Sequence, residues 1–168
     1  MSIQVAGSGR VVDPAEFRGS TDGPLGTWTK LTAADTDGKA FAFTGIVDPG
    51  VLNPPHTHAR EDEVTYVLEG QLTVEIGDEI HKAAPGSVVW KPRAVRHAFW
   101  NSTDQPVRYF EVISPAGLEG FTEVIGRLAA AGELRAEKVF ELAPTYGIEY
   151  DLAHTAELLE RHNLRLPA

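Results

Sequence analysis

The chain has 168 residues, of which 42% are hydrophobic and 23% are charged, and its formal net charge is −9. This length fits one domain with a real core, and so negative a charge argues against nucleic acid as a partner. The chain contains no cysteine, which excludes disulfides and thiolate-bound metal, so any metal site must use histidine and carboxylate ligands.

The first forty residues carry the weakest structural signal. Gly- and Asp-rich turns occur around residues 19–26, and residues 27–31 are a candidate strand. Two interpretations of residues 1–40 stay open: extra edge strands of a sheet, or an arm exchanged in a dimer. The segment lacks the basic start and apolar run of a secretory signal, and no apolar run in the chain approaches about 20 residues. We therefore expect a cytoplasmic protein without a membrane partner.

Residues 41–114 alternate apolar and polar positions in short runs separated by Gly, Pro, Asp and Asn, which is typical of antiparallel strands and tight turns. Turn chemistry is supplied by Glu69-Gly70 and Gly77-Asp78. We predict an all-β core, a sandwich or jelly roll. The predicted strands cover residues 40–47, 64–68, 71–76, 87–90, 97–101 and 107–113.

Residues 115–168 change to a helical pattern and are predicted to pack on the β core as a C-terminal extension of the same domain. Phe121, Val124, Ile125 and Leu128 recur at three- and four-residue steps, and Gly132 ends the first helix. A second helix is predicted over residues 136–142 and a third over residues 153–162. The side chains of the third helix expected to face the body are Leu152, Ala156, Leu158 and Leu159.

The strongest chemical signal is the spacing of His56, His58 and Glu63. Residues two apart on a strand point to the same face, so both imidazoles can reach one ion. Glu63 lies five residues beyond His58, an odd separation that would put it on the opposite face of an uninterrupted strand. The chain must therefore turn within residues 59–62, so that a neighbouring strand presents the carboxylate.

A second block places His97 five residues after Pro92, with Asn101 following. Together the blocks from residue 50 to residue 101 resemble the two motifs of the cupin superfamily, although the second motif usually has glycine where Ala94 stands. The resemblance implies a cupin jelly-roll β-barrel over residues 41–114. It also implies that the metal ligands are His56, His58, Glu63 and His97.

Three histidines and one carboxylate suit a single divalent transition metal ion: Fe, Ni, Mn, Co, Cu or Zn. Four protein ligands around an ion that prefers six leave two positions for water, oxygen or substrate. The alternatives are a closed four-coordinate zinc site and a degenerate cupin that keeps these residues as a polar network.

The two blocks, together with the segment from Tyr146 to Glu149, are similar to those of single-domain bacterial quercetinase-like cupins. This resemblance implies a dioxygenase acting on a small hydroxylated aromatic or enolic compound, with Glu63 as both ligand and catalytic base, and a homodimer. Because cupins host many activities, two alternatives stay open. One is a metal-assisted isomerase, cyclase or lyase, and the other is a non-catalytic protein that binds a small molecule.

The remaining polar candidates receive structural interpretations. Glu61 and Asp62 are read as solvated loop residues or as partners of the ligands, whereas Lys91, Arg93 and Arg96 crowd around Pro92 and leave room for a small-anion pocket. We predict that the histidines outside both motifs lie on the surface without a chemical role: His81, His154 and His162.

The barrel aromatics are assigned to the core. This set comprises Phe43, Tyr66, Trp90, Phe99, Trp100 and Phe110. Phe99 shares its strand parity with His97, so we expect it to border the metal pocket. Trp100 points the other way, toward the other sheet or a dimer contact.

Overall fold

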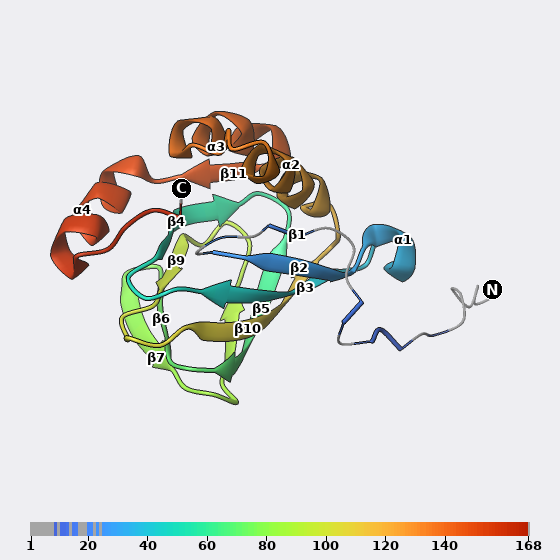
Figure 1. Ribbon diagram of the computed structural model, residues 1–168, viewed down its shortest axis with the longest axis horizontal. Coiled ribbons are helices and arrows are strands. Elements are labelled where there is room, and N and C mark those ends of the chain that lie inside the picture. The colour runs from blue at the N-terminus through green and yellow to red at the C-terminus, as the bar shows by residue number, and fades with distance from the viewer. Residues whose placement is uncertain are drawn as a thin grey trace.

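The computed structural model describes residues 9, 11–13, 15–16, 20–21, 23 and 25–167. Two antiparallel sheets pack against each other, with α2 (Glu119–Ala130) and α3 (Ala136–Leu142) at the top of the view, α4 (Leu152–His162) at the left and the short α1 (Ala33–Thr36) at the right (Figure 1). This arrangement confirms the predicted jelly-roll β-barrel with a C-terminal helical extension. The six-stranded sheet has the order β1 (Ser20–Thr21), β2 (Thr27–Leu31), β3 (Phe41–Val47), β10 (Val107–Ser114), β5 (Asp62–Glu69), β8 (Val88–Lys91). The five-stranded sheet has the order β11 (Ile148–Tyr150), β4 (Leu52–His58), β9 (His97–Trp100), β6 (Leu72–Ile76), β7 (Glu79–Ala83).

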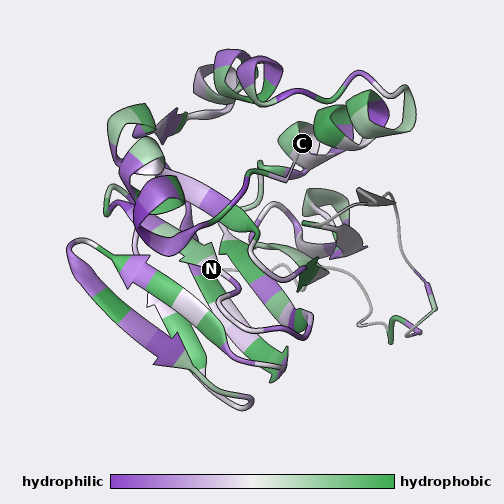
Figure 2. Ribbon diagram, turned by 60° about the vertical axis from the view of Figure 1, so that its left-hand side comes forward, coloured by the Kyte–Doolittle hydropathy of each residue, from purple (hydrophilic) through white to green (hydrophobic). Residues whose placement is uncertain are grey.

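Hydrophobic and hydrophilic residues alternate along several strands, as Figure 2 shows. The central strand β10 illustrates the cause, because Val107, Tyr109 and Ile113 are buried while Arg108 is exposed. Residues of one parity therefore fill the space between the sheets. Glu111 has this same inward parity and is also buried, so a carboxylate lies in the barrel interior.

The predicted strands agree with the structure to within two residues, but the sequence did not delimit β4, β7, β11 or the short helix α1 (Ala33–Thr36). In β4 the alternation is interrupted by Pro54 and Pro55, and the register to β9 shifts between Asn53 and His56. Proline lacks the N–H that a ladder requires, which explains why this strand is hard to recognise from its sequence.

Part of the N-terminal segment belongs to the six-stranded sheet. Ser20 pairs with Trp28, and β2 in turn pairs with β3, so β1 and β2 form one edge of this sheet. Most of residues 1–19 lie outside the described part of the chain. An arm exchanged between subunits therefore stays a prediction.

The helical extension contains α2 (Glu119–Ala130), α3 (Ala136–Leu142), a 3-10 helix (Ala143–Tyr146) and α4 (Leu152–His162). In Figure 1, α2 and α3 lie together above β11, and α4 lies apart from them at the left of the view, near β4. Within the described residues, no helix combines the length and the apolar character needed to cross a membrane.

The buried face of α4 differs from the predicted one. Thr155 and Leu158 are buried, whereas Leu152 is 53% exposed and Ala156 is exposed too. Leu158 packs in a small cluster with Leu52, Ala98 and Trp100. The indole of Trp100 is therefore covered by α4 on the outer side of the five-stranded sheet.

An exposed apolar face lies on the outside of β5 and β8, and it corrects the core assignment of Tyr66 and Trp90. Trp90 is 64% exposed and Tyr66 is 42% exposed. Strand register places Trp90 opposite Val64 and Tyr66 opposite Val88. We call this surface the β5–β8 face: Val64, Tyr66, Leu68, Val88 and Trp90.

Candidate metal centre

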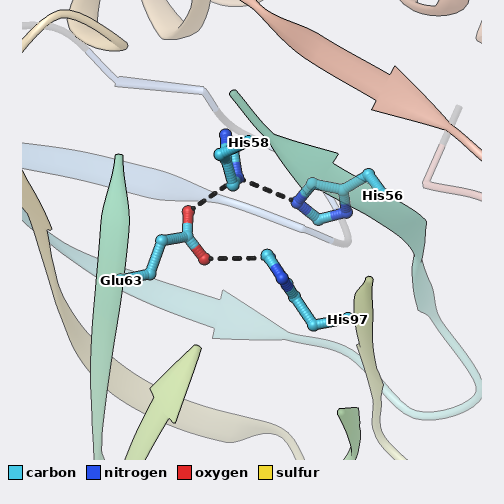
Figure 3. A group of neighbouring side chains, drawn as sticks. All are labelled: His56, His58, Glu63 and His97. Carbon is cyan, nitrogen blue, oxygen red and sulfur yellow. Dashed lines mark hydrogen bonds and ion pairs between the residues drawn. The ribbon is translucent and has the colours of Figure 1, made fainter. Parts of the chain in front are cut away.

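The four predicted ligands come from three strands and converge between the two sheets (Figure 3). β4 carries His56 and His58, β9 carries His97 directly opposite His56, and β5 carries Glu63. The chain turns at residues 59–61, as the odd spacing required. Glu63 is presented from the facing sheet, not from a strand that pairs with β4.

The ligand atoms all lie within 4.8 Å of one another. His58 Nε2 is 3.1 Å from His56 Nε2 and 3.1 Å from Glu63 Oε1, and His97 Nε2 is 3.3 Å from Glu63 Oε2. All four side chains are buried. The structure thus brings together the complete set of residues selected from the sequence.

Backbone carbonyls set the orientation of two of the imidazoles. Nδ1 of His56 lies 2.7 Å from the Pro54 carbonyl oxygen, and Nδ1 of His97 lies 3.0 Å from that of Val95. A carbonyl can only accept, so each Nδ1 carries the hydrogen and each Nε2 offers a lone pair to the centre. Nε2 of His97 is buried and makes no hydrogen bond. A buried acceptor without a donor is costly, and a metal ion would satisfy it.

The protonation states also suit a metal. Burial lowers the pKa of His56 well below its usual value, with further lowering by His97 and His58, and burial lowers the pKa of His97 as well. Burial alone would raise the pKa of Glu63. However, the Lys91 ammonium and the close contacts with His58 and His97 hold that pKa well below its usual value. Neutral imidazoles and an ionised carboxylate are the forms that ligate metal.

The donor set therefore fits one divalent transition metal ion, with nitrogen and oxygen ligands in a buried position. These donor types do not select among Fe, Ni, Mn, Co, Cu and Zn.

Two buried charged residues that the sequence did not assign to the site lie behind Glu63. Lys91 Nζ is 2.6 Å from Glu63 Oε2 and 3.2 Å from Glu111 Oε1. Thr65 Oγ1 donates to both carboxylate oxygens of Glu111, at 3.1 and 2.9 Å. β8 pairs with β5 and places Lys91 directly opposite Glu63, a register that the sequence alone did not give.

The electrostatics of this pair follow from burial and from mutual contact. Burial opposes the charge of Lys91, but Glu111 and Glu63 together raise its pKa. Burial raises the pKa of Glu111 to about 7, against the lowering effect of Lys91. Lys91 therefore stays charged at neutral pH.

The predicted small-anion pocket of Lys91, Arg93 and Arg96 is wrong. Lys91 points into the barrel, Arg93 Nη2 binds Asp62 Oδ2 at 2.7 Å, and Arg96 Nη2 binds Asp78 Oδ1 at 2.9 Å. Each cation is held by its own carboxylates, so the three charges do not converge.

Two further readings of polar residues are corrected by burial. Glu61 is only 2% exposed and lies 3.5 Å from Arg60 Nε, so it is not a solvated loop residue. His154 is partly buried, and its Nε2 lies 2.6 Å from Oε1 of the buried Glu75. This contact ties α4 to the five-stranded sheet. His81 and His162 are exposed, as predicted.

A cavity of about 180 Å³ opens beside Glu63. Its walls are mainly apolar and aromatic, and the helices α2 and α3 contribute Phe121, Ile125, Val139 and Phe140. Phe99 lines the cavity, as its parity predicted, and its ring centroid is 5.3 Å from Lys91 Nζ. Such a pocket suits a small, largely apolar molecule that meets a polar end at Glu63.

Comparison with known proteins agrees with this fold. Residues 43–113 match the family model described as the cupin domain. The polyketide synthase CurC of Streptomyces cyaneus is 32% identical over 109 residues, which are 63% of this chain and 70% of CurC. A germin-like protein of Arabidopsis thaliana is 36% identical over 96 residues, or 54% of this chain, and the chain covers only 43% of that protein. KdgF from a Halomonas species superposes with a TM-score of 0.56 at 21% identity, over 64% of this chain and 94% of KdgF.

Proposed function

The chain belongs to the cupin family, and we propose that it is a metal-dependent dioxygenase of a small hydroxylated aromatic or enolic compound. One observation carries the proposal: a buried cluster of three imidazoles and a carboxylate meets, at Glu63, a cavity with apolar and aromatic walls. A fold alone does not define an activity, so this argument rests on the site.

The residues around the cavity support several steps of such a reaction. When bound, a divalent transition metal would supply a Lewis acid and, if it is redox-active, electrons for oxygen chemistry. Phe121 and Phe140, from α2 and α3, line the cavity and reduce the access of water to a bound substrate. Lys91 contacts Oε2 of Glu63 and lowers the proton affinity of this carboxylate. The role of Glu63 as catalytic base stays a prediction.

A second candidate function is a metal-assisted cyclase or isomerase, and the similarity to CurC favours it. That relative is named a polyketide synthase, and a polyketone chain enolises readily, so the substrate of this second candidate would be an enolic chain that closes into a ring. The same four ligands would hold the metal, and the same cavity would hold the substrate. This reaction would not consume oxygen.

The test begins with metal analysis of protein purified without an affinity tag or chelator. We expect about one equivalent of metal, its loss in His58→Ala, and its retention in the matched control His81→Ala, which removes an exposed histidine. Oxygen uptake with flavonols and related enols then tests the dioxygenase. Conversion of such a substrate at an undiminished rate without oxygen would favour the cyclase or isomerase. Protein without metal in any preparation would contradict both.

A further inference from the structure

We propose that the hydroxyl of Tyr150 donates a hydrogen bond to an uncharged oxygen of the bound substrate, such as a ketone carbonyl, and so selects which apolar compounds the cavity accepts. This inference deepens the proposed function and rests on it, because it takes the cavity beside Glu63 as the substrate site. Tyr150 lies outside residues 43–113, which match the family model. The proposed role therefore belongs to the C-terminal extension and not to the barrel that this model covers.

Strand pairing fixes the backbone of Tyr150 next to the metal ligands. Figure 1 shows β11 between α3 and β4, and the register of β11 and β4 places Tyr150 directly opposite His56. Opposite residues of an antiparallel pair project to the same face of the sheet, so the side chain of Tyr150 points inward as that of His56 does. The next amide, that of Asp151, donates to the Pro55 carbonyl at 2.9 Å and holds the segment in place.

Two neighbouring rings hold the side chain of Tyr150. The centroid of its ring lies 5.4 Å from that of His56 and 4.9 Å from that of Phe140 in α3, with interplanar angles of 45° and 61°. Tilted pairs at these distances are favourable and restrict the orientation of the ring. Because Tyr150 also lines the cavity, its hydroxyl is a donor whose position is set before a ligand binds.

This donor is not used by the protein itself. The charged side chains that line the described part of the cavity, Glu63, Lys91 and Glu111, contact one another. The hydroxyl of Tyr150, in contrast, makes no hydrogen bond within the part of the chain that the structure describes. A phenolic hydroxyl is protonated at neutral pH and loses free energy where it has no acceptor. A site of this kind favours a ligand with an acceptor oxygen over a ligand of the same shape without one.

The other tyrosine of the cavity, Tyr109, is placed differently. It lies on β10 of the six-stranded sheet, and its hydroxyl oxygen is 2.5 Å from the position that a Cβ of Gly45 would take. Its ring contacts Phe43 and Phe99, with centroids 6.1 and 5.6 Å away. Of the two tyrosines, Tyr150 is the one on the sheet that carries all three imidazoles of the metal centre.

The experiment compares two neutral probes of the same shape: acetophenone, which has a carbonyl oxygen, and α-methylstyrene, which has a methylene group in its place. Dissociation constants are measured by ligand-observed NMR on the protein as purified, and its metal content is recorded. We expect the wild type to prefer acetophenone, and Tyr150→Phe to reduce this preference about fivefold while the affinity for α-methylstyrene stays within about twofold. Tyr146→Phe is the matched control, because it removes a tyrosine hydroxyl from the same extension at a residue that does not line the described cavity. It should leave the preference unchanged.

Three outcomes would overturn the inference: an unchanged preference in Tyr150→Phe, an equal loss of affinity for both probes, which indicates a role in packing alone, or no measurable binding of acetophenone to the wild type. Circular dichroism checks that each variant is folded. The metal content tests the proposed function separately. Protein without metal whose preference still depends on Tyr150 would remove the proposed function and support this inference, whereas metal-loaded protein whose preference ignores Tyr150 would refute this inference alone.

Discussion

Replacing Ala94 with glycine is expected to stabilise the protein. Ala94 is in the left-handed region, with φ of 60°, at the position where the cupin motif usually has glycine. A residue with a Cβ in this conformation destabilises the folded state by about 1–2 kcal/mol. Glycine also increases the entropy of the unfolded chain, and this offsets about 0.4–1 kcal/mol of the stability gained by relieving the strain. We expect Ala94→Gly to raise the free energy of unfolding by about 0.5–1 kcal/mol, or the midpoint temperature by about 1–4 °C.

The backbone hydrogen bond that this turn makes to the strand of His58 should be unchanged in the variant. The backbone N–H of Ala94 donates to the His58 carbonyl at 2.8 Å, and glycine keeps that donor. The measurement is urea unfolding of chelator-treated protein, followed by metal uptake. Ala84→Gly is the matched control, because Ala84 is exposed and its φ is not positive, so it should lose about 0.4–1 kcal/mol. Equal destabilisation by both substitutions would refute the argument from backbone strain.

Three further predictions concern other parts of the barrel. A Cβ at Gly45 would overlap the ring of Tyr109, 2.5 Å from its hydroxyl oxygen, so Gly45→Ala should cost about 1–3 kcal/mol in urea unfolding; an unchanged midpoint would contradict this packing. Hydrogen bonds from Arg93 lower the pKa of Asp62 from 3.8 to about 2. Its stabilising contribution is therefore present above about pH 4 and lost as the pH falls toward 2, and Asp62→Asn should flatten this part of the stability profile; an unchanged acid limb would count against it. Finally, we propose that two copies of the chain associate through the β5–β8 face beside the edge strand β8, so Trp90→Lys should convert a dimer to a monomer in light scattering.

The control for the last prediction is Ile80→Lys, since Ile80 is 46% exposed on β7 of the other sheet. It should leave the mass unchanged. A wild-type protein that is monomeric at every concentration would refute the proposed dimer, because the β5–β8 face would then not bind a second copy of the chain.

Three of the four ligands were predictable because their signal is local, and the fourth, His97, followed from the resemblance of the second block to the cupin motif. His56, His58 and Glu63 lie within eight residues, and the chemistry of metal binding restricts which residue types can occupy them. Lys91 and Glu111 were missed because their roles depend on how β8 and β10 pair with β5. That register is set by the whole sheet, and no short segment encodes it.

The misassigned aromatics have a different cause. Alternation in β5 reveals two faces but does not show which one is inward, and large aromatics are usually assigned to the core. The inward position of Glu63 resolves this, because Thr65 and Val67 then face the core and Tyr66 faces out. A charged ligand thus determines the orientation of a strand better than the hydrophobicity of its neighbours does.

The pairing of β11 with β4 has a consequence for how the protein can be shortened. Ile148 lies opposite His58 and Tyr150 opposite His56, so the C-terminal segment closes the edge of the strand that bears both histidines. A chain cut at Pro144 would retain the four ligands and the matched family region, yet it would leave the amides and carbonyls of β4 open to pairing with other molecules. Such a minimal barrel is expected to aggregate. In the full chain, metal loading should slow amide exchange in β11, far along the sequence from any ligand.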